Sequence, residues 1–222
     1  MERTTSLIRA KEIMGSNIIG PGELKSVKTE MGITVPNNIL DILPLIQFSE
    51  DLLERNKHEY LLILGISNYK DGTPLTLVKM REHFGWDPEK SKPCFYNQDW
   101  YLLEQFANKT TLENKWYLLK KDVYEEYRGM SPNIILNRSN NILILPTAIL
   151  CAYTFFAYYY NSGGDILLKN NFVWCSDKDI NNDQIYVGRY NDSKGLNKDG
   201  FNIHRHLSIK NNFGYISEIQ PQ

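Results

Sequence analysis

The sequence predicts an α+β protein, with helices and strands mixed over the first 140 residues and an antiparallel sheet in the carboxy-terminal third. Three observations support this prediction. The unbroken apolar run EYLLILGI, at residues 59–66, is typical of a buried strand. The stretch 141–164 has no charged residue and is typical of a buried helix. Three later segments alternate apolar and polar residues, as half-buried strands do.

The composition favours a soluble, cytoplasmic protein that binds neither nucleic acid nor membranes. With 25 Lys and Arg residues against 26 Asp and Glu residues, no overall field attracts the chain to phosphate backbones. Cys94, Cys151 and Cys175 are odd in number and form no CxxC pair, which favours neither a disulfide framework nor a thiolate metal site. The first residues, MERTTSLIRAKEIMG, lack the apolar core of a secretory signal.

We expect residues 1–40 to form an irregular N-terminal arm, because Gly and Pro interrupt every long periodic stretch there. Between residues 41 and 222, no repeat, low-complexity tract or clear linker marks a boundary. The sequence therefore predicts a single α+β unit over 41–222. A subdivision into 41–140 and 141–222 is the alternative, because the pattern changes character after the uncharged stretch.

Local signals place the helices and strands of the first part. Ser49, followed by two acidic residues, predicts a helix start, because its hydroxyl can cap the helix and the acids favour its positive end. Pro74 and Gly85 predict the two ends of another helix. We expect a further helix over 99–108, and a strand over 115–121 in KWYLLKK.

The uncharged stretch 141–164 is long enough to span a bilayer. Pro146 interrupts it, Thr147, Thr154 and several Tyr residues interleave with its apolar residues, and flanking Lys and Arg are sparse. These features favour a buried central helix over a membrane-spanning one.

The segments 171–176, 184–190 and 201–209 predict a one-sided antiparallel sheet. Successive side chains of a strand point to opposite faces, so Ile185 and Val187 are expected to point into the core. Their neighbours would then form a polar and aromatic outer face.

Three groups of residues suggest metal chemistry, each with a simpler reading beside it. Oxygen side chains at every second residue of Asp177–Asp183 suggest a calcium loop, or else a solvated hairpin turn. His204 and His206 share one strand face, as transition-metal ligands or as surface histidines. Asp99 with Glu113 and Lys115 suggests a magnesium-dependent hydrolase or nuclease, or else ordinary surface charge.

The chain carries none of the strong catalytic signatures. It contains no nucleophile elbow, P-loop, GxGxxG or HExxH sequence. Cys94 and His83 could pair as nucleophile and base, but a packed, inert cysteine is the simpler interpretation. We therefore expect a protein that is not an enzyme, without catalytic residues, without a cofactor and without a metal beyond the calcium loop already named.

The segment VWCSDKDINNDQIYVGRYNDSKGLN, with the later NIHRH and NNFGYIS, resembles the carboxy-terminal region of the target proteins of diversity-generating retroelements. Upstream segments such as FYNQDWYLLEQFA are similar to parts of some uncharacterised bacterial members. The resemblance implies a C-type-lectin-like fold, related to formylglycine-generating enzymes, that displays variable ligand-contacting residues on a rigid scaffold.

The resemblance also implies which positions would form the ligand-binding face. They are Tyr186, Arg189, Tyr190, Asn191, Asp192, Asn197, Asn202, His204 and His206. Tyr, Asn and Arg suit recognition, because they combine contact area with adaptable hydrogen bonds. The first hypothesis is thus a non-catalytic binding protein that recognises a protein or glycan partner. The alternative is a metal-dependent hydrolase or nuclease.

Overall fold

The computed structural model describes residues 3–138, 144–192, 198–206 and 208–221, which form an α+β protein. The described helices are α1 (Leu7–Met14), α2 (Pro21–Ser26), α3 (Lys28–Met31), α4 (Ile39–Ile42), α5 (Glu50–Asn56), α6 (Leu77–Phe84), α7 (Gln105–Asn108), α8 (Pro132–Arg138) and α9 (Ala148–Ser162), with a 3₁₀ turn at Glu125–Tyr127. The described strands are β1 (Ile18–Ile19), β2 (Tyr60–Leu64), β3 (Trp116–Lys120), β4 (Phe172–Lys178), β5 (Gln184–Gly188), β6 (Asn202–His204), β7 (Phe213–Gly214) and β8 (Glu218–Ile219).

The strands form two mixed sheets. The first has the order β1-β2-β3-β8, with β1 parallel to β2 and the other pairs antiparallel. The second has the order β6-β5-β4-β7, with β7 parallel to β4 and the other pairs antiparallel. The expected antiparallel carboxy-terminal sheet is therefore present, with one parallel strand added at its edge.

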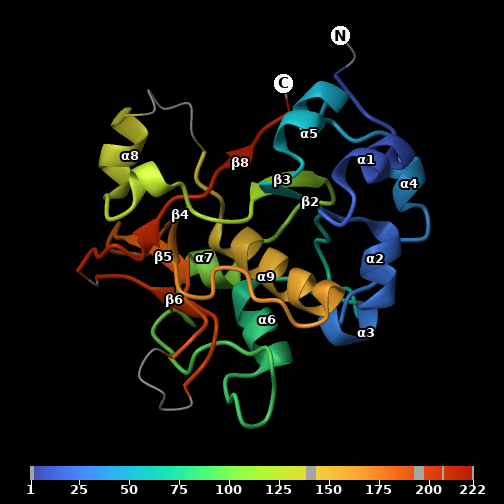
Figure 1. Cartoon of the computed structure of the whole chain (residues 1–222). Helices are drawn as coiled ribbons and strands as arrows, with labels where there is room; N and C mark the ends of the chain where they lie inside the picture. Colours follow the sequence, from blue (N-terminus) through green and yellow to red (C-terminus); the bar gives the residue numbers. More distant parts are fainter. Residues whose placement is uncertain (1–2, 139–143, 193–197, 207, 222) are drawn as a thin grey trace.

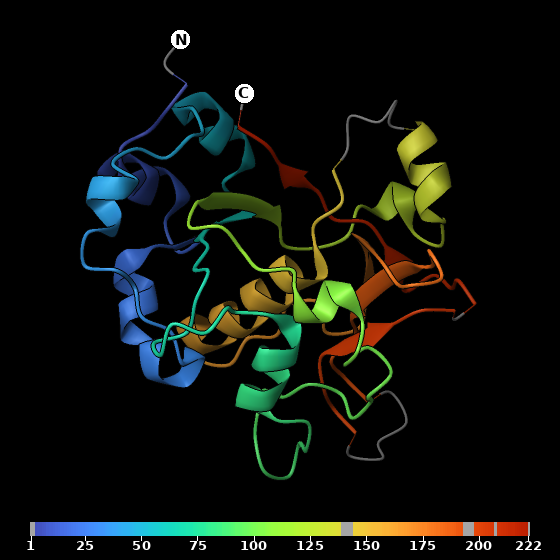
Figure 2. The same ribbon diagram turned by 180° about the vertical axis from the view of Figure 1, so that it is seen from behind.

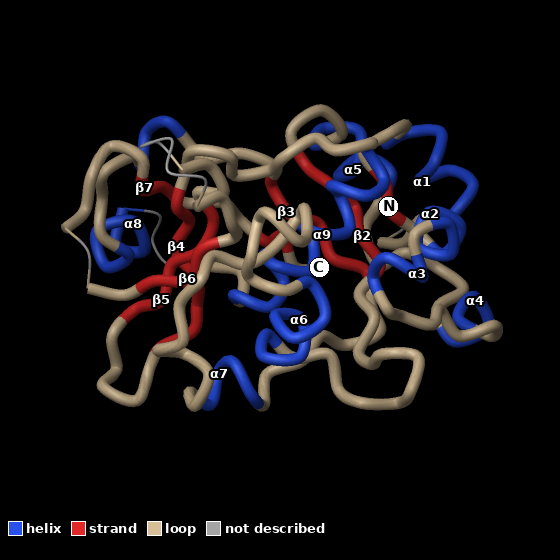
Figure 3. Tube along the Cα trace, turned by 90° about the horizontal axis from the view of Figure 1, so that it is seen from below, coloured by secondary structure: helices blue, strands red, loops and turns tan. Residues whose placement is uncertain are grey.

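Helix α9 lies between the two sheets and joins their cores (Figures 1 and 3). Its aromatic side chains reach both ways. Phe156 stacks on Phe84 of α6 at 3.9 Å between ring centroids, and Phe155 stacks on Tyr190 just beyond β5 at 5.3 Å. One apolar cluster includes residues of β2, α9 and β5, so a boundary between 41–140 and 141–222 would cut through a continuous core.

The carboxy-terminal segment links the sheets a second time. Residues 213–219 pair first with β4, as β7, and then with β3, as β8. Between these strands, the Ser217 hydroxyl lies 2.6 Å from the Tyr60 hydroxyl and 3.0 Å from the Tyr124 hydroxyl. Both sheets are thus held by a single short stretch of chain.

Most of the local predictions for residues 41–164 are confirmed. Ser49 caps α5 by accepting a hydrogen bond from the Leu52 N–H, and the expected strands at 59–66 and 115–121 are β2 and β3. The helix expected from Pro74 begins later, because the Thr76 hydroxyl caps it, but it ends before Gly85 as expected. The helix expected over 99–108 is reduced to α7.

The expected central helix is α9, which is buried along most of its length. None of the helices in the described part of the chain is long and apolar enough to cross a membrane.

The prediction of an irregular arm over residues 1–40 is wrong. This region contains α1, β1, α2 and α3, and its apolar side chains join the main core, with Ala10 and Leu24 fully inaccessible. The Gly and Pro residues separate short helices instead of preventing them. Pro21 occupies the first turn of α2, and Gly32 ends α3 in the left-handed conformation, at φ 65°.

The prediction of a one-sided carboxy-terminal sheet is also wrong. One face packs on α9, while the other packs against a second apolar cluster around Ile135 of α8, Trp174 and Tyr186 (Figure 3). The Trp174 indole N–H donates to the carbonyl of Met130, which fixes the segment preceding α8 over the sheet. Because α8 covers the supposed outer face, the sheet is buried on both sides.

Candidate functional site

The residues expected to form the ligand-binding face do not share one exposed surface. Tyr186 is 1% exposed and packs edge-on against Trp174 and Phe172. Tyr190 is 3% exposed. The expectation that both face solvent is wrong, because the second cluster covers one ring and α9 covers the other.

Asn202 and His204 of β6 are also largely withdrawn from solvent. The Asn202 amide donates to the carbonyls of Arg189 and Gly200, so it closes the chain on itself. His204 lies among the rings of Tyr96, Phe172 and Tyr186. Burial, with a smaller contribution from Arg189, lowers the pKa of His204 to about 4, so this imidazole is neutral at physiological pH. The exposure expected for Asn202 is therefore wrong.

The remaining candidates lie around the ends of β5 and β6. Arg189, at φ 44°, is half-buried with its guanidinium 5.7 Å from the Phe172 ring centroid. Asn191 and Asp192 are half-buried, and His206 is exposed. Asn197 lies outside the described residues. The structure thus scatters the nine candidates among a core, a turn and a sheet edge.

The oxygen-rich loop Asp177–Asp183 forms a hairpin turn between β4 and β5. Asn182 takes the left-handed conformation, at φ 67°, that the turn requires. One oxygen of Asp179 accepts from the N–H groups of Asn181 and Asp183, and the other pairs with Arg205. Of the two readings of this loop, the solvent-facing hairpin turn describes its backbone.

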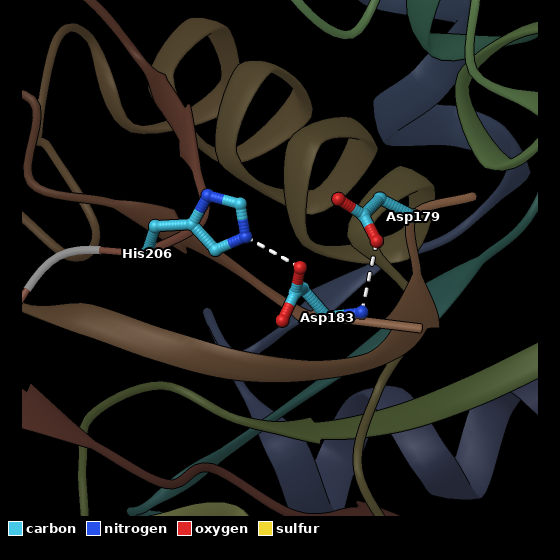
Figure 4. A group of neighbouring side chains, drawn as sticks. All are labelled: Asp179, Asp183 and His206. Carbon is cyan, nitrogen blue, oxygen red and sulfur yellow. Dashed lines mark hydrogen bonds and ion pairs between the residues drawn. The ribbon is translucent and has the colours of Figure 1, made fainter. Parts of the chain in front are cut away.

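Asp179, Asp183 and His206 converge near this turn, with one potential ligand atom from each within 4.8 Å of the others (Figure 4). Every group already has a partner, because Asp183 pairs with His206 and Asp179 pairs with Arg205. Burial alone would raise the pKa of Asp179, but the Asp183 N–H and the guanidinium outweigh it and leave the pKa below its usual value. A guanidinium thus stands where a cation would balance the buried carboxylate. His204 does not join His206 in this group.

The residues suggested for magnesium chemistry form separate ion pairs. Asp99 accepts from Arg81 of α6 at 2.6 Å, whereas Glu113 lies 3.6 Å from Lys115 at the start of β3. Neither carboxylate belongs to the group of potential metal ligands found among the described residues. No observation brings these three side chains to one centre.

Cys94 and His83 likewise have different partners. The Cys94 thiol donates to the carbonyl of Asp199, and burial raises its pKa to about 11. The His83 imidazole interacts with the carbonyl of Glu30 at 2.6 Å. Cys94 therefore has the properties of a packed thiol that stays protonated at neutral pH.

A cavity of about 350 Å³ opens between two loops near the end of α6. It is lined by Trp86, Asp87, Pro88, Tyr96, Asn97, Lys198 and Asp199. Trp86 is 47% exposed, which is unusual for the largest apolar side chain. The cavity combines aromatic surface with several hydrogen-bonding groups, and its volume lies within the roughly 300–1,000 Å³ typical of small-ligand sites.

The cavity exists because two distant segments meet at close range. Tyr96 N–H donates to the Phe201 carbonyl, and Phe201 N–H donates to the Cys94 carbonyl. Gly200 makes this approach feasible, since a Cβ there would lie 2.4 Å from the Tyr96 nitrogen. The sheet edge thereby carries Lys198 and Asp199 to the loop that bears Trp86.

The polar groups of the cavity are held in place by neighbours. The Asp199 carboxylate accepts from the Asp192 N–H at 2.8 Å. A hydrogen bond from the Glu89 N–H, with help from Lys90, keeps the pKa of Asp87 below its usual value. The Arg81 guanidinium lies 4.9 Å from the centroid of the Trp86 ring, a cation–π contact that orients the indole. The site thus offers an oriented indole beside two hydrogen-bonding carboxylates.

The sequence interpretation overlooked Trp86 and treated Tyr96 as a core residue. A local signal was available, because Gly85 ends a helix and Trp86-Asp87-Pro88 follows directly in a polar loop. A large apolar residue in such a loop has no helix face or strand face to bury it. The contribution of Lys198 and Asp199 had no comparable local signal.

Comparison with protein-family models, with curated proteins and with solved structures finds no match to this chain.

Proposed function

We propose that the protein is a non-catalytic binding protein that recognises its ligand in the cavity around Trp86. The observation that carries this proposal is the exposed indole in a cavity that also presents Tyr96 and two carboxylates. The proposal keeps the binding role expected from the sequence and moves the site from the strand face to the loops. A C-type-lectin-like architecture and a cytoplasmic location remain part of it, the latter supported by three buried free thiols.

Between a protein and a glycan partner, the cavity favours a glycan. A sugar ring has an apolar face that can stack on an indole and a rim of hydroxyl groups that pair with carboxylates and amides. Trp86 and Tyr96 supply the aromatic surface, while Asp87, Asn97 and Asp199 supply acceptors. A concave site of this volume holds one or two sugar rings, whereas a protein partner usually needs a much larger surface.

Binding to an array of immobilised oligosaccharides tests the proposal. We expect the wild-type protein to bind a defined subset of the array, and Trp86→Ala to weaken that binding by at least about tenfold. Ile42→Ala is the matched control, because Ile42 is 56% exposed and does not line the cavity. The absence of glycan binding, or equal binding by Trp86→Ala and wild type, would contradict the proposal.

A further inference from the structure

Two aliphatic side chains on different loops are almost fully exposed. Leu103, in the loop before α7, is 95% exposed, and Ile180, in the turn between β4 and β5, is 86% exposed. They are the two most exposed large apolar side chains among the described residues. We call them the 103/180 surface.

The two loops are joined directly next to these side chains. The carboxylate of Glu104, the residue after Leu103, accepts from the Ile180 N–H at 3.0 Å. Seen from behind, α7 lies close to the strands of the second sheet (Figure 2). Leu103 and Ile180 therefore belong to one local surface although 77 positions separate them.

The base of this surface is held by a buried cation. The Arg205 guanidinium pairs with Asp179, whose side chain is fully inaccessible, and lies 3.6 Å from Glu104. It also stacks 4.5 Å from the centroid of the Trp100 ring. Because Arg205 contacts both loops at once, the exposed side chains are displayed from a fixed base instead of from independent flexible tips.

The charge around this surface discriminates among occupants. The supporting residues include four carboxylates, Glu104, Asp177, Asp179 and Asp183, and two permanent cations, Lys178 and Arg205. This excess of negative charge disfavours an anionic lipid surface. A contact between two copies would place like charges together, and two aliphatic side chains per copy would bury far less than the roughly 1,000 Å² of a stable interface.

We propose that the 103/180 surface docks a different protein, one that presents an apolar pocket with a basic rim. Leu103 and Ile180 enter the pocket, and the carboxylates of the turn face the basic rim. Desolvated aliphatic anchors of this kind account for much of the affinity of small interfaces. This binding role is separate from the Trp86 cavity, because none of its residues lines that cavity.

The test begins with a photo-crosslinking amino acid at position 103 or 180 of the full chain in its native cells, with position 42 as the exposed control. We expect one protein to be captured at 103 and 180 and not at 42. That protein is then purified, and its affinity is measured for wild type, for the double variant Leu103→Ser with Ile180→Ser, and for Ile42→Ser.

The expected result is at least about tenfold weaker binding by the double variant, with Ile42→Ser and Trp86→Ala unchanged, and weaker binding of wild type at high salt. The absence of an adduct specific to 103 and 180, or equal affinity of the double variant, overturns the proposal. So does a wild-type dimer that the double variant abolishes in sedimentation. Wild-type binding to vesicles of phosphatidylcholine and phosphatidylserine that the double variant loses overturns it as well.

Discussion

The strand face around Tyr186 and the loop cavity around Trp86 contain similar side chains, but only the cavity exposes them. Tyr186 and Asn202 are 1% and 7% exposed, whereas Trp86 is 47% exposed. The strand residues are held by α8 and by backbone carbonyls, and the cavity residues are held from behind, with their functional groups facing outward. Recognition therefore depends on which side chains remain uncovered after packing, and residue type alone does not reveal it.

The largest expected effect that sharpens this comparison is on stability. Tyr186→Ala should lower the free energy of unfolding by about 3–5 kcal/mol, because it removes a ring from the centre of the second apolar cluster. Urea denaturation measures the change. If Tyr186 were a ligand contact on an open face, this variant would unfold at nearly the wild-type urea concentration.

The second effect concerns a polar residue on the same strand face. Asn202→Ala should cost about 1–3 kcal/mol of stability, because the carbonyls of Arg189 and Gly200 lose their buried donor. Chemical denaturation of the variant checks this value. A variant with unchanged stability and impaired ligand binding would instead return Asn202 to the binding site.

The third effect is a pH dependence of stability. His204 has a pKa of about 4 in the folded protein, below its ordinary value of 6.5. Between these values the unfolded chain binds the proton more tightly, so the stabilisation is complete above pH 6.5 and is lost as the pH falls towards 4. Since the side chain is partly exposed, we expect a loss of only about 1–2 kcal/mol.

Urea midpoints between neutral pH and pH 4 test this prediction. The slope with pH should decrease in His204→Gln and stay unchanged in His58→Gln, which alters an exposed histidine. Equal slopes in wild type and His204→Gln would show that the imidazole of His204 is solvated.

The smallest expected effect belongs to the cavity. Trp86→Ala should change the free energy of unfolding by less than about 0.5 kcal/mol, because half of the indole already faces solvent. Thermal or urea unfolding measures it. A loss comparable to that of Tyr186→Ala would identify Trp86 as a packing residue and remove the basis of the comparison.

Sequence patterns predicted the elements whose signals are local. The apolar run of β2, the Ser49 cap and the uncharged α9 are each determined by neighbouring residues, and all three are confirmed. The exposure of the second sheet could not be predicted in this way. Strand alternation separates two faces, but it does not tell whether a face meets water or a second layer such as α8.

The candidate site was harder to predict than the fold, because its walls come from distant parts of the chain. Tyr96 and Gly200 meet through backbone contacts across more than a hundred residues, and no pattern in either segment specifies the other. Similarly, nothing in the sequence pairs Arg205 with Asp179 and Glu104. Long-range packing determined both surfaces.

The central claim is that solvent reaches the loop aromatics and not the strand aromatics, and hydroxyl-radical footprinting of the native protein tests it most directly. Mass spectrometry of the labelled peptides should find fast oxidation at Trp86, intermediate oxidation at Tyr96 and protection at Tyr186 and Tyr190. Oxidation of Tyr186 and Tyr190 as fast as that of Trp86 would contradict the account.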